Sequence, residues 1–215
     1  MKMLTLAIFG ALMMVQPVYA DAVDDGVAHL QQQWAVINYK TPDPKVQLEK
    51  MAALADEADQ LTAANPNRAE PLVWSAIIKS TEAGMKGGMG ALGLAKQARR
   101  ELEQAIKIDG KALDGSAYTS LGSLYYQVPG GPIGFGSKKK ARANLKQALA
   151  INPDGIDANY FYGDFLLRRK KYDEAIAAFE HALDAPARPN RPIADEGRRK
   201  EIEAKLAEAK AKIAG

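Results

Sequence analysis

Apolar residues in this chain recur every three or four positions, and proline or glycine interrupts the pattern at intervals. This spacing is the period of one face of an α-helix. In residues 21–39 it is carried by Val23, Val27, Leu30, Trp34 and Ile37. A second run over residues 45–64 stops at Asn65-Pro66, because proline lacks an amide donor and clashes with the preceding turn. The pattern predicts an antiparallel helix hairpin here, and no useful β pattern follows it.

Two later stretches can be superimposed with the same residue types at the same offsets. The first helix of residues 116–153 carries Tyr118, Leu121, Gly122 and Tyr125, and its second helix carries Ala141, Leu145, Ala148 and Pro153. In residues 157–183 the corresponding positions are held by Gly163, Tyr172, Ala175, Phe179 and Ala182. The spacing resembles the tetratricopeptide repeat, a helix-turn-helix unit of about 34 residues that stacks into a solenoid.

The resemblance implies an all-α fold: a right-handed, TPR-like α-solenoid of antiparallel helix hairpins over residues 21–185. A proline-rich connection (186–194) then leads to a C-terminal capping helix (195–215). An earlier unit begins near Glu70, with Ile78 at the position that is glycine in the later copies. Glycine at a helix crossing allows close approach of two backbones, so Ile78 is expected to separate the helices of this degenerate repeat.

The first two repeats are lengthened between their helices. Twelve residues separate Gly163 from Ala175, but nineteen separate Gly122 from Ala141 and twenty separate Ile78 from Ala98. Insertions in a solenoid map to loops at one edge, where binding functions often lie. We therefore expect the glycine-rich segments 82–96 and 128–141 to form neighbouring loops, a composite lip of the groove.

The second segment also suggests an anion site, because glycine-rich turns can direct several amides at one anion. The candidate residues are Gly131, Gly134, Gly136, Ser137, Lys138 and Lys139. Ser137 is the expected N-cap of the next helix. The simpler interpretation is a capped turn with solvated lysines. A nucleotide-binding P-loop is excluded, since serine precedes lysine and a helix precedes the turn, and no cofactor is expected.

The resemblance also assigns the concave groove, which is lined by the first helix of each repeat. The implied partner-binding residues are Ser75, Lys79, Glu82, Thr119, Ser123, Tyr126, Tyr160, Asp164 and Arg168. Most other aromatic residues of the repeats are expected to pack between helices. The groove set mixes hydroxyls, both charge signs and two tyrosines, which suits an extended peptide or a small polar-aromatic ligand.

Composition narrows the function further. The chain has no cysteine, only two histidines and a formal net charge of +3. This charge is too small for a nucleic-acid track, and Met85 and Met89 lack a third ligand for a metal site. Serine stands in no nucleophile-elbow setting, so catalysis is not expected, although carboxylates such as Asp164 and Glu174 leave it open.

Residues 1–20 are typical of a secretory signal peptide. Lys2 precedes an apolar run, and Val18-Tyr19-Ala20 forms a small-residue cleavage site. No later segment is apolar enough to span a membrane. The sequence predicts an exported, periplasmic protein without an integral membrane segment.

Residues 129–154, "PGGPIGFGSKKKARANLKQALAINPD", are similar to the T component of tripartite periplasmic TRAP transporters. This second resemblance implies a homo-oligomer that presents a small organic ligand to a periplasmic solute-binding protein. The prediction from the sequence is a non-enzymatic scaffold or adaptor that binds a protein or peptide in its concave groove. The alternative is an accessory subunit of the TRAP type.

Overall fold

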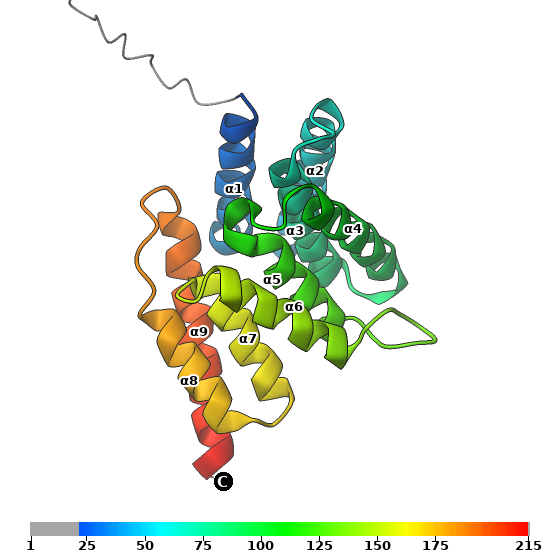
Figure 1. Cartoon of the computed structure of the whole chain (residues 1–215). Helices are drawn as coiled ribbons and strands as arrows, with labels where there is room; N and C mark the ends of the chain where they lie inside the picture. Colours follow the sequence, from blue (N-terminus) through cyan, green and yellow to red (C-terminus); the bar gives the residue numbers. More distant parts are fainter. Residues whose placement is uncertain (1–21, 215) are drawn as a thin grey trace, which may run out of the picture.

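The computed structural model describes residues 22–214, and every regular element in that part of the chain is an α-helix (Figure 1). The predicted signal peptide lies outside the described residues. The helices are α1 (Ala22–Lys40), α2 (Pro44–Ala64), α3 (Ala69–Lys86), α4 (Gly88–Asp109), α5 (Ala112–Gln127), α6 (Lys138–Ile151), α7 (Ile156–Arg168), α8 (Tyr172–Leu183) and α9 (Pro192–Ala214). The all-α solenoid of hairpins expected from the sequence is confirmed.

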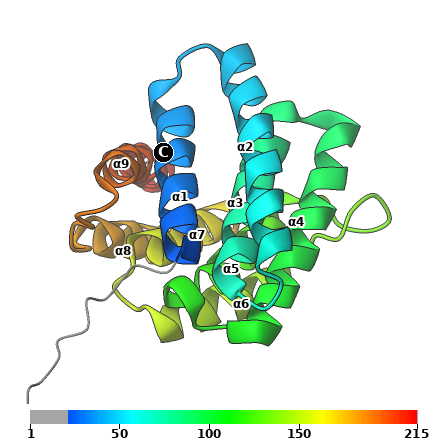
Figure 2. The same cartoon turned by 90° about the horizontal axis from the view of Figure 1, so that it is seen from above.

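The helices form two layers. Helices α1, α3, α5, α7 and α9 contact one another in succession, and α2, α4, α6 and α8 pack behind them. The last inner helix also contacts the first, and α1 lies between α2 and α9 when the molecule is seen from above (Figure 2). The inner layer is therefore a closed ring, whereas a capping helix on the last repeat would have left an open groove.

Close packing of α9 on α1 holds the ring together. A Cβ atom on Gly197 would lie 2.4 Å from Cδ1 of Tyr39, so only glycine permits this approach. Ala194 is buried with the apolar residues of α1 and α2. An exposed ion pair joins Lys40 to Glu196 at 2.8 Å. The capping helix begins at Pro192, three residues earlier than predicted.

The glycines at the later helix crossings have the predicted role. A Cβ atom on Gly122 would lie 2.7 Å from Cγ of Leu145, and one on Gly163 would lie 2.6 Å from Cε1 of Phe179. Leu145 and Phe179 are fully buried. Each glycine of the inner helix thus receives a large side chain from the outer helix of the same hairpin.

The α3–α4 hairpin departs from prediction in two respects. Residues 82–96 do not form a loop, because α3 continues to Lys86 and α4 begins at Gly88. Only Gly87 separates them, with a φ of 62° that favours glycine at a helix end. The alanine, leucine, methionine and lysine of the insertion are good helix formers, so it lengthens both helices.

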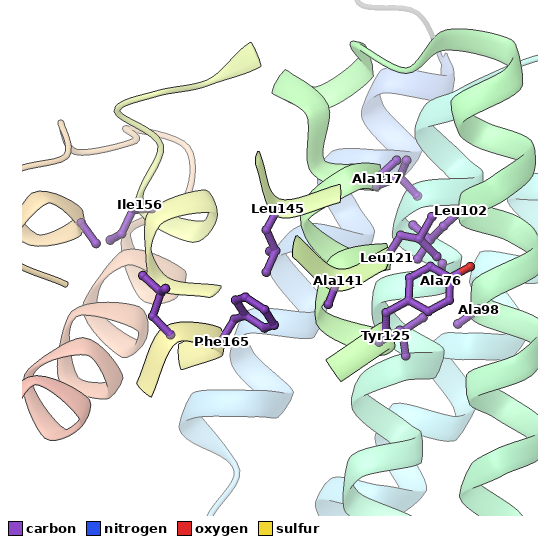
Figure 3. Packing of buried hydrophobic residues seen from close by; sticks show 14 of the residues in the cluster. Ala76, Ala98, Leu102, Ala117, Leu121, Tyr125, Ala141, Leu145, Ile156 and Phe165 are labelled. Atoms are coloured by element: carbon purple, nitrogen blue, oxygen red, sulfur yellow. The ribbon is translucent and has the colours of Figure 1, made fainter. Parts of the chain in front are cut away.

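The second departure concerns Ile78. This side chain is buried with the apolar residues of α1 and α2, and it does not separate α3 from α4. The α3–α4 contact is made by alanines, with Ala76 and Ala98 in the same cluster as Leu102. Figure 3 shows Leu121 and Tyr125 of α5 packed beside these residues. The face of α3 that contacts α4 is therefore not the one that the repeat alignment predicts.

Candidate functional site

The inner ring surrounds a partly open cavity of about 270 Å³. Its lining residues come from α1, α3, α5, α7, α9 and the segment before α9. They are Trp34, Trp74, Ile77, Ser80, Thr81, Gly84, Ser116, Thr119, Ser120, Ser123, Leu124, Gln127, Asp157, Phe161, Arg191 and Arg198. The cavity combines an aromatic wall with a row of hydroxyls, the composition of a ligand site rather than of a core.

The two walls have different chemistry because of helical spacing. Trp74, Ile77 and Thr81 follow one face of α3 at intervals of three and four residues. Thr81 accepts a hydrogen bond from Nε1 of Trp34 at 2.9 Å and donates one to the carbonyl of Ile77 at 2.9 Å. These bonds fix the indole ring of Trp34 at the edge of the cavity.

On α5 the cavity face is polar. Thr119, Ser120 and Ser123 line it, and the Gln127 amide donates to the Ser123 hydroxyl at 2.7 Å. Two of these residues, Thr119 and Ser123, were predicted to line the groove from the sequence. The resemblance therefore located the concave face of α5.

The resemblance to the tetratricopeptide repeat did not locate the concave face of α3. Ser75, Lys79 and Glu82 are buried, and none of them lines the cavity. The side chain of Lys79 is only 2% exposed, and its ammonium group pairs with Asp59 of α2 and Glu101 of α4. These three residues lie on the faces of α3 that pack against the outer helices. The repeat alignment predicts that Trp74 packs between helices, but Trp74 itself lines the cavity. The groove face predicted for α3 is therefore wrong.

Three of the predicted groove residues meet between α5 and α7. The Tyr126 hydroxyl donates to Oδ2 of Asp164 at 2.8 Å, and Nε of Arg168 donates to the same oxygen at 3.1 Å. Burial raises the pKa of Tyr126 well above its usual value, and the charge of Asp164 raises it further. None of the three is among the lining residues of the cavity. They link neighbouring repeats beside it.

Tyr160, the remaining predicted groove residue, is covered by the C-terminal helix. The guanidinium carbon of Arg198 lies 4.4 Å from the centroid of its ring. Burial raises the pKa of Tyr160 to about 12, although Arg198 lowers it. Tyr160 is therefore a contact between α7 and α9 and is not available as an open groove position.

Sequence reasoning missed an arginine cluster at the end of the ring. Arg188 donates to Oδ2 of Asp157 at 2.7 Å and to Asp195 at 2.7 Å. Arg198 donates to Oδ1 of Asp157 at 2.8 Å and also pairs with Glu201. Burial raises the pKa of Asp157, but the charges of Arg198 and Arg188 outweigh it and hold this pKa well below the usual value.

Arg191 completes the cluster but is bonded differently. Its guanidinium carbon lies 5.1 Å from the centroid of the Trp74 ring, and its Nε is buried without a hydrogen-bond partner. Burial lowers the pKa of Arg191; the charges of Asp157 and Asp195 raise it, and those of Arg188 and Arg198 lower it. The sequence signal for Arg188 and Arg191 is arginine between prolines in residues 186–194, a composition that predicts only a connection.

The predicted anion loop is held together by its own amides. The amides of Gly134, Gly136 and Ser137 donate to the carbonyls of Gly130, Pro129 and Tyr125 at 3.1, 2.9 and 2.7 Å. They are therefore not free to surround an anion. The hydroxyl of Ser137 caps α6 as predicted, since it accepts from the Lys140 amide at 3.3 Å.

The rest of the loop supports a structural role. The Phe135 ring stands edge-on to that of Tyr125 at 5.8 Å, and Arg99 of α4 lies 4.6 Å above Phe135. Gly131, Lys138 and Lys139 are exposed. The loop thus contacts the inserted hairpin at one edge of the molecule, as expected, but as a packed turn against a helix.

Comparison with known proteins supports the repeat fold. Residues 136–191 match the tetratricopeptide repeat family. The crystal structure of TTC0263, a thermophilic TPR protein of Thermus thermophilus, is similar over 86% of this chain and 100% of its own, with 18% identity and a TM-score of 0.59. The fold is a TPR-like α-solenoid.

A second solved structure, that of MamA, aligns over 92% of this chain and 97% of its own, with 19% identity and a TM-score of 0.46. No curated protein matches the sequence. Between residues 22 and 214, no helix has the length and apolar character needed to cross a membrane. The TPR-like fold is typical of protein-interaction scaffolds.

Proposed function

We propose that the protein is an exported, non-enzymatic scaffold that binds a short segment of a protein or peptide partner in the cavity of its inner ring. The observation that carries this proposal is the convergence of side chains from five inner helices on one hollow. A packed repeat core would fill such a space with aliphatic side chains. Here Trp34 and Trp74 face a row of serine and threonine hydroxyls.

The dimensions restrict what can bind. A volume of about 270 Å³ accommodates one or two side chains rather than an extended strand. A second hollow of about 360 Å³ shares Trp74, Ser116, Thr119, Asp157 and Arg191 with the first. The two hollows adjoin beside the arginine cluster, and we propose that a bound segment extends from one into the other.

Ring closure also favours the second candidate, an accessory subunit that holds a small organic ligand. The contact of α1 with α9 surrounds the hollow with inner helices, an arrangement that also suits a small ligand. Under this alternative the partner is a periplasmic solute-binding protein, and the chain acts as a homo-oligomer. A melting temperature that rises with small organic acids but with no peptide would favour the alternative.

A variant that fills the cavity tests the site. Ser120 lines the hollow and is half-buried, so Ser120→Phe should occupy space without disturbing a packed contact. We expect peptides selected from a random heptapeptide library on the wild-type protein to lose at least about tenfold in affinity for this variant, because a bulky ring excludes the ligand. Calorimetric titration measures the loss.

The matched control is Gln147→Phe, which places the same side chain on an exposed position of the outer helix α6. It should bind the selected peptides as the wild type does. Equal binding by Ser120→Phe and the wild type would refute the cavity as the binding site.

A further inference from the structure

One arginine of the cluster, Arg191, is not paired directly with a carboxylate, although Asp157 and Asp195 act on it electrostatically. Arg188 and Arg198 take up the carboxylates of Asp157, Asp195 and Glu201. The guanidinium of Arg191 forms no hydrogen bond and no ion pair within residues 22–214, and its Nε is buried. A buried polar group without a partner is costly, so it indicates a missing ligand group when it faces a hollow.

The position of Arg191 makes it accessible to a ligand. It lines both the central cavity and the adjoining hollow. One face of the guanidinium is covered by the ring of Trp74, at 5.1 Å from the centroid. Stacking of this kind occupies the face and leaves the edge, with its forked N–H donors, for a planar partner.

The surroundings select the chemical class of that partner. Asp157 and Asp195 act on Arg191 electrostatically, but neither forms a direct ion pair with it, and both oxygens of Asp157 already accept from Arg198 and Arg188. Carboxylates bind guanidinium through two parallel hydrogen bonds. Trp34 and Phe161 supply aromatic surface in the same cavity. An aromatic or apolar group bearing a carboxylate would satisfy both requirements.

We propose that the cavity binds a carboxylate carried on an aromatic or apolar group, with the Arg191 guanidinium as its counterion and Trp74 beneath it. This inference rests on the proposed function, because it names the chemistry of the group that enters the ring. The carboxylate comes either from an acidic side chain of a partner segment or from a small organic acid.

The chain contains its own reporter for this binding. It has two tryptophans, Trp34 and Trp74, and both line the cavity. Titration with phenylacetate, followed by tryptophan fluorescence, is compared with titration by the neutral phenylacetamide. We expect phenylacetate to bind at least about tenfold more tightly, the usual gain from a hydrogen-bonded charge pair. Equal affinities for the two compounds would overturn the proposal.

Variants assign the preference to one residue. Arg191→Gln should lose the preference for phenylacetate over phenylacetamide, and Arg191→Lys should retain part of it, because the charge remains while the planar fork is lost. Arg169→Gln removes the same charge from an exposed position outside the cavity lining and should leave the preference unchanged. Helical circular dichroism verifies that each variant is folded. An undiminished preference in folded Arg191→Gln would contradict the assignment.

A pair of peptides separates the two sources of the carboxylate. Both are blocked at their ends, and one contains Phe-Glu where the other contains Phe-Gln. Tighter binding of the Phe-Glu peptide supports a partner segment. Binding of phenylacetate with neither peptide supports the carboxylate site with a small acid and refutes the peptide function. Equal binding of both peptides refutes the carboxylate inference while the scaffold function stands, and no binding of any probe refutes both.

Discussion

Two hairpins of the same solenoid are held together by different chemistry. In α7–α8 the bare backbone at Gly163 accepts the ring of Phe179, and the interface is entirely apolar at that point. In α3–α4 the corresponding region carries the buried ammonium group of Lys79, which joins Glu101 of α4 to Asp59 of α2. A shared topology therefore does not require a shared core. The contact between Gly163 and Phe179 can be predicted from the sequence of one hairpin. The ion network forms only when α2, α3 and α4 are packed together.

The largest loss of stability is expected from disrupting the ion network of the α3–α4 hairpin. Lys79→Met should destabilise the chain by about 3–5 kcal/mol, because it leaves Glu101 without its cation. Glu101 is 13% exposed at its side chain, and its Oε2 is already buried without a partner. Chemical denaturation followed by circular dichroism measures the change.

The double variant Lys79→Met with Glu101→Leu is the informative control for the ion network. It removes both buried charges and should recover much of the lost stability, since an apolar pair can replace a buried ion pair. Asp59, which is 48% exposed at its side chain, would then be solvated. A double variant no more stable than Lys79→Met would show that the ion pair is not the source of the loss.

A smaller loss of stability is expected from disrupting the apolar contact of the α7–α8 hairpin. Gly163→Ala places a methyl group 2.6 Å from Phe179, whose side chain is fully buried. Overpacking of this kind costs about 1–3 kcal/mol. Thermal unfolding of the purified variant provides the measurement.

Gly93→Ala in α4 is the matched substitution, because a Cβ atom there meets nothing within 4 Å. It should raise stability by up to about 1 kcal/mol through helix propensity alone. Destabilisation of equal size by both alanine substitutions would refute the account of the Gly163 crossing.

A third loss of stability, which depends on pH, concerns Asp157, the residue that joins α7 to the arginine cluster. Its pKa is held below the usual value of 3.8 in the folded chain. In acid the unfolded chain therefore binds the proton more readily, and the stabilisation is present above about pH 4 and is lost as pH falls below it. Asp157→Asn should cost about 1–3 kcal/mol at neutral pH, the range for charged hydrogen bonds.

The difference in unfolding free energy between Asp157→Asn and the wild type should shrink between about pH 4 and pH 2. Urea denaturation at several pH values measures it. A constant difference over this interval would show that the ion pairs of Asp157 do not stabilise the ring.

The sequence allowed correct prediction of the features that depend on neighbouring residues. Apolar spacing located the hairpins, and the match of glycine to a large side chain identified the α5–α6 and α7–α8 crossings. The prediction failed for the segment 82–96, since glycine content suggested a loop although most of its other residues favour helix. Of the predicted groove residues, Thr119 and Ser123 line the cavity. Ser75, Lys79 and Glu82 do not, because the repeat pattern is degenerate in α3, and Tyr126, Tyr160, Asp164 and Arg168 make contacts between helices instead.

Sequence alone thus determined the all-α repeat, its hairpin boundaries to within a few residues and the N-cap at Ser137, because each depends on residues close in the chain. Tertiary structure decided the closure of α9 on α1, the concave face of α3 and the unpaired state of Arg191. The pairing of Arg188 and Arg198 with Asp157 spans 31 and 41 residues. Such contacts depend on curvature accumulated over successive repeats, which no local pattern of side chains encodes.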